Sequence, residues 1–363
     1  MDTLYRRPLP PETIAFSSPE GQRVFADALA AGGLGGYFAL AEQYQTQSDP
    51  AFCGLGSLVV ALNALAIDPG RLWKGPWRWF SEDLLDCCVS LEQVRAQGVD
   101  LDTLGCLARC NGAEATVVRP GPDDDELRAA VSRTSAGAGA VLVAAYDRAA
   151  LGQTGSGHFS PLGGYHAARD LVLVMDVARF KYPPHWVALP RLAAAMHTID
   201  PATDRARGWL ELRPRAGGHA IMLSLACRGT SWPELAARLR AALATRWPDD
   251  TPLATVARAL APLTEHCEAR EPAAADHAAA VAQTRLALRA TEAHRVARAV
   301  ADGDRADATA ALLLLYARVQ PAGGALAAAL ARLAAEGAAV PALAAELDRL
   351  AAQSEALRAT WPG

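Results

Sequence analysis

The spacing of hydrophobic and capping residues predicts helices in three parts of the chain. Residues 54–66 and 326–350 repeat leucine and valine at helical intervals, and a break from Gly337 to Pro341 divides the second segment into a helical hairpin. Residues 18–31 also predict a helix, because Ser18 can cap it and a proline follows in the first turn. The repeating positions are Leu55, Leu58, Val59, Leu62, Leu65, Leu326, Leu330, Leu333, Leu343, Leu347 and Leu350.

Strands and a change in composition define the expected domains. Residues 140–146, 158–165 and 171–177 predict strands, and because helices precede them we expect an α+β domain. Residues 1–220 contain 35 alanines and 18 aromatic residues, whereas residues 221–363 contain 46 alanines and four aromatic residues. Sequence rich in alanine and poor in aromatic residues favours helix. We therefore predict an α+β domain over 1–220 and an Ala-rich, mostly α-helical domain over 221–363, with a linker at 215–218.

Overall composition narrows the class of protein. The 363 residues are 51% hydrophobic and 20% charged, which suffices for a packed core and excludes a disordered chain. A net charge of −4 argues against nucleic-acid binding, and no run of about 18 uncharged apolar residues predicts a membrane span. No apolar leader follows the first arginines, so we expect a cytoplasmic protein. The aromatic stretch 73–79 is expected to pack in the core and its loops.

Cys53 is a candidate nucleophile. The chain has seven cysteines, an odd number without a secretory signal, which favours reduced thiols over disulfides. Cys53 directly precedes the helix predicted over 54–66, where unpaired backbone N–H groups and the helix dipole stabilise a thiolate. A buried cysteine that only packs at a helix start is the alternative.

His158 and Asp176 are the candidates for a general base and its partner. A hairpin that turns at residues 167–168 places His158 opposite Asp176 on the neighbouring strand. Such an aspartate fixes the histidine tautomer and stabilises the imidazolium, as in a nucleophile–base–acid triad. A surface pair between two strands is the alternative, although Asp176 ends an apolar run.

Gln47 is the candidate donor for an oxyanion. Its side-chain amide and the backbone N–H of Cys53 could together stabilise a tetrahedral intermediate. The order of the four candidates along the chain is that of papain-like thiol enzymes. The local signature of cysteine proteases is missing, however, because Gly-Leu rather than Ser-Cys-Trp follows the cysteine.

Long motifs over residues 4–213 resemble the phytochelatin synthase family. They are LYRRPLP (4–10), FSSPEG (16–21), QTQSDPAFCGLGSL (45–58), IDPGRLWKGPWRWF (67–80), LLDCC (84–88), QTGSGHFSPLGGY (153–165) and DVARFKYPPHWV (176–187). The resemblance implies a papain-like cysteine-peptidase fold. It also implies a triad of Cys53, His158 and Asp176, with Gln47 as oxyanion donor.

The activity that the resemblance implies is acyl transfer from glutathione. Cys53 would hold the γ-Glu-Cys unit as a thioester after glycine leaves, and a second glutathione or a phytochelatin would accept that unit. The resemblance implies no organic cofactor but activation by a heavy-metal ion such as cadmium or zinc, bound as a glutathione thiolate complex, because soft ions prefer thiolates. Two alternatives stay open: a hydrolase that removes glycine from glutathione or its conjugates, and a non-catalytic thiol protein that buffers metal.

The resemblance also implies binding residues. Those for donor glutathione are Gly157, Asp200 and Arg207; those near the acceptor are Thr46, Arg148 and Lys181, and Arg179 braces the site. Cys87, Cys88, Cys106 and Cys110 match family cysteines and are candidate metal ligands, although buried apolar thiols are the alternative because no four-ligand spacing is present. The helical domain has only Cys227 and Cys267, so we expect it to stabilise or gate the enzyme. Expected partners are glutathione, phytochelatins and heavy-metal ions, with no nucleic acid or membrane, in a monomer or a homodimer.

Overall fold

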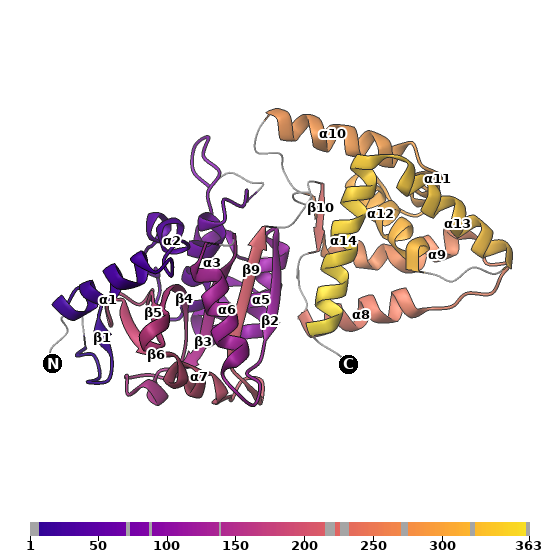
Figure 1. Ribbon diagram of the computed structural model, residues 1–363. Helices are drawn as coiled ribbons and strands as arrows, with labels where there is room; N and C mark the ends of the chain where they lie inside the picture. The colour runs from indigo at the N-terminus through magenta and orange to yellow at the C-terminus, as the bar shows by residue number, and fades with distance from the viewer. Residues whose placement is uncertain are drawn as a thin grey trace. The chain divides into compact units, whose positions relative to one another are not determined.

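The protein consists of two compact units. The computed structural model describes residues 7–69, 73–86, 89–137, 139–214, 222–225, 232–269, 275–319 and 324–360. Contacts along the chain group Met1–Asp68 with Trp79–Ala216 in the first unit, and Pro69–Arg78 with Gly217–Gly363 in the second. The first unit holds α1 to α7 and β1 to β9, and the second holds α8 to α14 and β10 to β11 (Figure 1).

The first unit contains both helices and strands, with most of the helices early in the chain. Its helices are α1 (Pro19–Ala30), α2 (Tyr37–Gln43), α3 (Cys53–Ala64), α4 (Leu91–Gln97), α5 (Leu101–Cys110), α6 (Asp125–Ser135) and α7 (Leu189–His197). Its 3-10 helices are η1 (Glu82–Leu84), η2 (Ala149–Leu151) and η3 (Ala167–Arg169). Its strands are β1 (Ile14–Ala15), β2 (Ala113–Val118), β3 (Val141–Asp147), β4 (Gly157–His166), β5 (Leu171–Val174), β6 (His185–Ala188), β7 (Ile199–Asp200), β8 (Arg205–Ala206) and β9 (Gly208–Pro214).

A seven-stranded antiparallel sheet lies at the centre of this unit. Its strand order is β1-β6-β5-β4-β3-β9-β2, and β7 and β8 form a separate pair. Alternate residues of β3, such as Leu142 and Ala144, join a buried cluster with Leu127 of α6 and Leu192 of α7. The predicted α+β class is confirmed, while the papain-like assignment stays a prediction.

Helices α1 and α3 agree with the sequence-based predictions to within two residues. Ser18 caps α1, since its Oγ accepts the N–H of Gly21 at 3.0 Å. Helix α3 begins at Cys53, and residues 54–63 are buried on every side rather than along one stripe. Gly54 lies against Phe159 of β4. Because side chains alternate between the two faces of a strand, Phe159 points to the face of the sheet opposite the cluster that contains α6 and α7. A fully buried helix of this kind fixes the position of its first residue.

The second unit is mostly helical, as predicted, but it also contains a two-stranded sheet that the sequence pattern did not indicate. Its helices are α8 (Trp232–Ala244), α9 (Leu253–Leu260), η4 (Ala261–His266), α10 (Ala275–Arg289), α11 (Glu292–Ala297), α12 (Gly303–Val319), α13 (Gly324–Ala339) and α14 (Pro341–Thr360). Strands β10 (Leu223–Leu225) and β11 (Cys267–Ala269) pair antiparallel. Glu346 of α14 accepts the N–H groups of Met222 and Leu223 at 3.0 and 2.8 Å.

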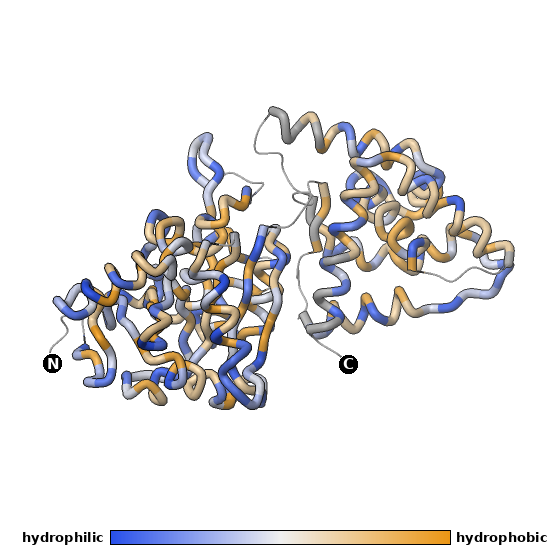
Figure 2. Tube along the Cα trace, viewed as in Figure 1, coloured by the Kyte–Doolittle hydropathy of each residue, from blue (hydrophilic) through white to orange (hydrophobic). Residues whose placement is uncertain are grey.

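Helix α12 is the core of the second unit. Every residue from 306 to 317 is buried, and α9, α10, α11, α13 and α14 all contact this helix. The predicted hairpin is confirmed as α13 and α14, and its six leucines are buried. Hydrophobic and hydrophilic positions are interspersed along these helices, as amphipathic packing requires (Figure 2). Within the described residues, no single helix is long and apolar enough to cross a membrane, and only the bent pair α13–α14 reaches that length and composition.

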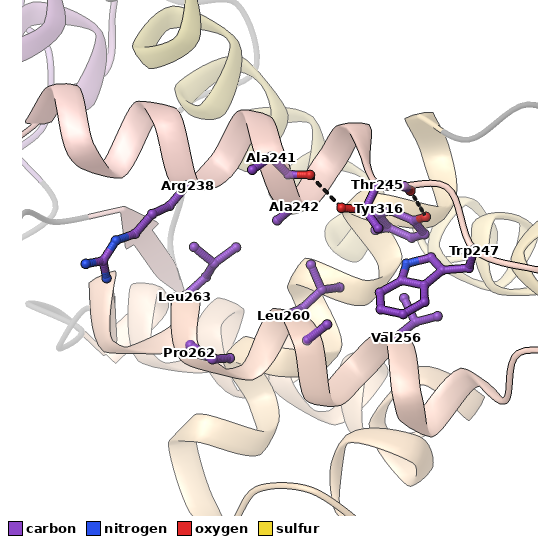
Figure 3. A pocket seen from close by; sticks show the side chains of 11 residues that line it. Arg238, Ala241, Ala242, Thr245, Trp247, Val256, Leu260, Pro262, Leu263 and Tyr316 are labelled. Carbon is purple, nitrogen blue, oxygen red and sulfur yellow. Dashed lines mark hydrogen bonds between the residues drawn. The ribbon is translucent and has the colours of Figure 1, made fainter. Parts of the chain in front are cut away.

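A pocket of about 370 Å³ lies between α8 and α9 (Figure 3). Leu260 and Val256 of α9, Trp247 and Tyr316 line its apolar part, and Arg238 of α8 stands at one end. Tyr316 Oη donates to the Thr245 carbonyl at 2.6 Å, which ties α12 to the end of α8.

The aromatic stretch 73–79 does not pack in the core, so that prediction was wrong. Trp73, Trp77 and Trp79 are 39%, 69% and 39% exposed. The segment forms a tight turn in which the Trp73 N–H donates to the Trp77 carbonyl at 2.8 Å. A turn this short has no second layer to cover its side chains, and only Phe80, at its base, is buried.

Candidate active site

Cys53 is the first residue of α3 and is partly exposed. No side chain caps this helix, and Cys53, as its first residue, lies at the positive end of the helix dipole. Burial by itself would raise the pKa of Cys53. The charge and hydrogen bond of His158, together with a hydrogen bond from the Phe159 backbone, outweigh burial and bring the pKa of Cys53 below its ordinary value. The thiol therefore has the environment of an activated nucleophile.

His158 and Asp176 are in direct contact. His158 Nε2 lies 2.9 Å from Asp176 Oδ1, and both side chains are buried. This bond uses Nε2, so Nδ1 is the ring nitrogen left for the thiol. Burial opposes a charge on His158, but Asp176 and a Cys53 thiolate attract the proton and raise the pKa of the imidazole above its ordinary value.

The predicted strand register was wrong even though the predicted contact is present. Tyr165 pairs with Val172, and a bulge between Leu162 and Gly164 shifts the pairing that follows. Strand β5 ends at Val174, before it would reach the level of His158. Asp176 instead reaches His158 from the loop after β5. The error arises at the turn, because His166 pairs with Leu171 and four residues, 167–170, lie between them instead of a tight turn centred on 167–168.

Asp176 is held by more groups than a triad requires. Arg148 Nη2 donates to Oδ1 at 2.9 Å and lies 2.8 Å from Oδ2, and the N–H of Ala178 donates to Oδ1 at 2.9 Å. Burial disfavours the carboxylate, but His158 and Arg148 hold the pKa of Asp176 well below its usual range. Contacts therefore run in one line from Cys53 through His158 and Asp176 to Arg148. Along this line the thiolate of Cys53 pairs with the imidazolium of His158, and the carboxylate of Asp176 pairs with the guanidinium of Arg148.

Arg148 lies against Asp176 of the triad. Its side chain is 3% exposed, and its guanidinium is bonded to Asp176 and Gln153. Its Cδ also lies near Gly155, as does Lys181 Nζ, and its expected role near the acceptor stays a prediction. A guanidinium has five N–H donors, so these two partners do not by themselves exclude a further anion.

Gln47 has no N–H group left for an oxyanion in this structure. Its Nε2 donates to the carbonyls of Asp49 and Pro50 at 2.8 and 3.0 Å, and an amide nitrogen has only two hydrogens. Gln47 Oε1 is buried without a partner. An oxyanion-stabilising role therefore requires that substrate displace one of the two carbonyls.

Gly157, Asp200 and Arg207 lie together. Arg207 Nη1 is 3.2 Å from Asp200 Oδ2, and a Cβ added to Gly157 would lie 2.6 Å from the same nitrogen. Thr198 Oγ1 also accepts from Arg207 Nε at 3.2 Å. A carboxylate, a guanidinium and an open glycine backbone next to His158 fit the charges of a γ-glutamyl group.

The other three expected substrate residues are less closely grouped. Thr46 and Arg179 are exposed, and Lys181 is half-buried beside Gly155. Burial and the nearby Arg148 lower the pKa of Lys181 below its ordinary value. Arg179 lies over the ring of Tyr44 at 4.9 Å. Across the described ranges, no hydrogen bond or ion pair joins Lys181 to Thr46 or Arg179.

The candidate metal ligands do not form a cluster in the part of the chain that the structure describes. Cys106 and Cys110 lie one turn apart on α5 and are 1% and 6% exposed. Cys87 and Cys88 lie outside the described residues. No group of three or more His, Cys, Asp or Glu side chains among the described residues could hold a metal ion. Metal binding by these cysteines stays a prediction.

Sequence reasoning missed several side chains that surround the triad. Tyr44 donates its hydroxyl to the Asp176 carbonyl, and the Tyr146 ring packs edge-on against His158 at 5.7 Å. Gln153 and His185 continue the contacts of Arg148. The last two fall inside the motifs QTGSGHFSPLGGY and DVARFKYPPHWV, close to His158 and Asp176 along the chain. Their closeness to His158 and Asp176 along the chain was the signal that could have identified them as part of the site.

A thiol at a helix N-terminus, with an imidazole and a carboxylate behind it, has the arrangement of a thiol-dependent enzyme that acts on an acyl group. The model of the phytochelatin synthase family matches residues 4–209, which is more than half of the sequence. The chain therefore belongs to the phytochelatin synthase family.

Three relatives illustrate the extent of the similarity. The chain is 49% identical over 235 residues to glutathione gamma-glutamylcysteinyltransferase 3 of Lotus japonicus, covering 64% of this chain and 49% of the relative. It is 47% identical over 242 residues to glutathione gamma-glutamylcysteinyltransferase 1 of Arabidopsis thaliana, covering 66% and 50%. It is 45% identical over 214 residues to the Schizosaccharomyces pombe glutathione gamma-glutamylcysteinyltransferase, covering 58% and 51%. The chain thus spans about half the length of these curated relatives.

Proposed function

We propose that the protein is a glutathione γ-glutamylcysteinyltransferase that makes phytochelatins. The observation that carries the proposal is the line of contacts from Cys53 through His158 to Asp176, with the pKa of the thiol lowered by the imidazole. The names of the relatives support the choice of substrate and reaction.

The first half of the reaction forms a thioester. The Cys53 thiolate attacks the carbonyl carbon of the Cys–Gly bond in glutathione, and the negative charge moves to the carbonyl oxygen. His158 gives its proton to the glycine nitrogen as the C–N bond breaks, so glycine leaves and γ-Glu-Cys stays on Cys53. Asp176 holds the imidazole in the tautomer that this transfer needs. Arg207, Asp200 and Gly157 would bind the γ-glutamyl end of the donor.

The second half of the reaction transfers the acyl group. His158, now neutral, takes a proton from the α-amine of a second glutathione as that nitrogen attacks the thioester. The C–S bond breaks and the thiolate of Cys53 is restored. A heavy-metal ion would enter with this acceptor as its thiolate complex, because soft ions prefer thiolate ligands.

Mass spectrometry of the intact protein tests the proposal. After brief mixing with glutathione, we expect a γ-Glu-Cys adduct that peptide mapping locates to Cys53. Chromatography with glutathione and cadmium should show products longer than glutathione together with free glycine. A protein that binds cadmium but never carries the adduct would instead be a thiol metal buffer.

A glycine-removing hydrolase is the second candidate, and one observation favours it. Asp176 neutralises part of the charge of Arg148, which weakens the attraction of this guanidinium for the carboxylates of an acceptor. Without a positioned acceptor, water attacks the thioester instead, because proximity is worth several kcal/mol to the amine. Production of γ-Glu-Cys and glycine alone, with the Cys53 adduct present, would establish the hydrolase.

A further inference from the structure

A chain of buried polar side chains continues from the triad into the protein. Arg148 Nη1 donates to Gln153 Oε1 at 2.6 Å, and Gln153 Nε2 lies 3.0 Å from His185 Nε2. His185 Nδ1 in turn lies 2.8 Å from the carbonyl oxygen of Pro183. Arg148, Gln153 and His185 are 3%, 4% and 0% exposed, so these three side chains have little access to water as a replacement partner.

The hydrogen bonds of this chain can point in only one direction. The Pro183 carbonyl only accepts, so His185 carries its proton on Nδ1 and accepts on Nε2. Gln153 must therefore turn its NH₂ group toward His185, which leaves its oxygen for the Arg148 guanidinium. Burial, which outweighs the attraction of Asp176, lowers the pKa of His185 below its ordinary value and so favours the neutral ring.

The loop that carries Gln153 closes on Arg148 itself. The N–H groups of Leu151 and Gln153 donate to the Arg148 carbonyl at 3.0 and 2.9 Å. Gly152 between them has a φ of 74°, which suits glycine and strains other residues. The guanidinium also lies over the ring of Tyr182 at 5.0 Å. The position of Arg148 is thus set by its own loop as well as by the charge that it neutralises.

We propose that Gln153 and His185 are positioning residues of the active site, which hold the Arg148 guanidinium against Asp176 and thereby tune the Cys53–His158 ion pair. The role in turnover rests on the proposed function. Arg148 acts on both partners, since its charge favours the thiolate of Cys53 and opposes the imidazolium of His158. Tyr146, Lys181 and Tyr182 are further titratable groups that interact with Arg148, and the variants below leave them in place.

The test measures the rate at which iodoacetamide alkylates Cys53 in the full chain, as a function of pH. Alkylation reports the thiolate directly and needs no glutathione. Gln153→Met keeps the side-chain length but makes none of its hydrogen bonds. We expect the acidic midpoint to rise by about 0.5–1 pH unit, because a displaced guanidinium no longer favours the thiolate. We also expect kcat for glycine release to fall about 10-fold while KM for glutathione stays within about twofold.

A second variant and a matched control separate this role from a general loss of stability. His185→Phe keeps an aromatic ring but removes the acceptor, so it should shift the midpoint in the same direction by less. Gln353→Met is the control: Gln353 is also buried, at 3% exposure, but it accepts the Leu225 N–H in the helical unit. It should leave the midpoint and kcat unchanged even if the protein unfolds at a lower temperature.

Two results would overturn the inference. One is a folded Gln153→Met protein with the wild-type midpoint. The other, decisive if Gln153→Met does not fold, is an unmoved midpoint in His185→Phe. If the wild type releases no glycine from glutathione but the variants shift the midpoint as expected, the proposed function fails and the positioning role stands.

Discussion

Each unit buries an aspartate between an arginine and a histidine, yet only one of these clusters has the parts of a catalytic site. In the first unit Asp176 contacts Arg148 and His158. In the second, Asp307 of α12 contacts Arg289 at 2.8 Å and His294 at 3.1 Å. Arg148 is 3% exposed whereas Arg289 is 45% exposed. An Asp–His contact is therefore a common structural pair, and what distinguishes the first is the thiol beyond its imidazole.

The two partly exposed thiols at Cys53 and Cys267 show the same contrast. Cys53 is the first residue of α3 and lies at the positive end of that helix. Cys267 instead follows η4, and its Sγ lies 3.7 Å from the Leu263 carbonyl. Burial raises the pKa of Cys267 to about 12. Burial also acts to raise the pKa of Cys53, but His158, the Phe159 backbone and Arg148 outweigh it. The end of the helix and the neighbouring charge, rather than burial, decide which thiol can react.

The largest expected effect comes from removing the Cys53 thiol, and removal of the Cys267 thiol is the comparison. Cys53→Ala should lower glycine release from glutathione by about 10⁴-fold or more, because the covalent intermediate cannot form. Cys267→Ala should leave the rate within about twofold, since that thiol has no imidazole partner among the contacts described. Quantification of free glycine measures both. Comparable losses in the two variants would remove the distinction between the thiols.

Asp176→Asn should reduce kcat by about 10³–10⁴-fold, because asparagine cannot stabilise the imidazolium and permits the wrong tautomer. The change also leaves Arg148 buried without its counter-charge, at a cost of about 3–5 kcal/mol in the free energy of unfolding. Kinetics below the unfolding transition and a urea titration measure the two effects separately. Near-normal kcat in a folded variant would show that His158 does not depend on this carboxylate.

At pH 7 the alkylation of Cys53 should exceed that of Cys267 by about 10³-fold. A thiol with a pKa of about 12 is about 10⁻⁵ thiolate at this pH, and one below 9.0 is more than about 10⁻² thiolate. With glutathione, activity should rise as pH passes the lowered pKa of Cys53 and fall as His158 loses its proton above its own raised pKa. Peptide mapping after timed labelling gives the ratio, and equal labelling would contradict it.

The smallest expected effect is on the stability of the helical unit. Asp307→Asn should destabilise that unit by about 2 kcal/mol, less than a fully buried pair costs, because Arg289 and Arg285 can turn to solvent. Its rate of glycine release at 25 °C should match the wild type. Calorimetry and the glycine assay on one preparation provide the check, and a catalytic defect without unfolding would show that this pair serves the reaction as well.

Local sequence patterns predicted the features that depend on one or two neighbouring turns. The cap at Ser18, the helix that starts at Cys53 and the leucine hairpin of α13 and α14 all depend on residues three or four apart. The contact of His158 with Asp176 was predicted from a hairpin count that is invalid, because four residues rather than two separate the paired His166 and Leu171. Both residues still meet because the loop after β5 turns back toward β4, a feature that the count did not contain.

The sequence pattern did not predict interactions between segments that are distant along the chain. Arg148 and Gln153 come from the loop between β3 and β4 and His185 from β6, and nothing in the sequence shows that the three form one network. The engaged amide of Gln47 depends on how a short turn presents two carbonyls. The exposure of Trp77 reversed the usual preference of large apolar side chains for the core. In each case tertiary geometry, which local propensity does not encode, decided the outcome.

The place of β9 in the sheet has a consequence for how the chain is synthesised. This strand, the last of the sheet in sequence, lies between β3 and β2, which have no other strand to join them. A nascent chain that has emerged only as far as residue 207 therefore presents two open sheet edges, which invite pairing with other chains. Ribosome-bound fragments that end before Gly208 should need protection by chaperones, and those that include Pro214 outside the exit tunnel should not.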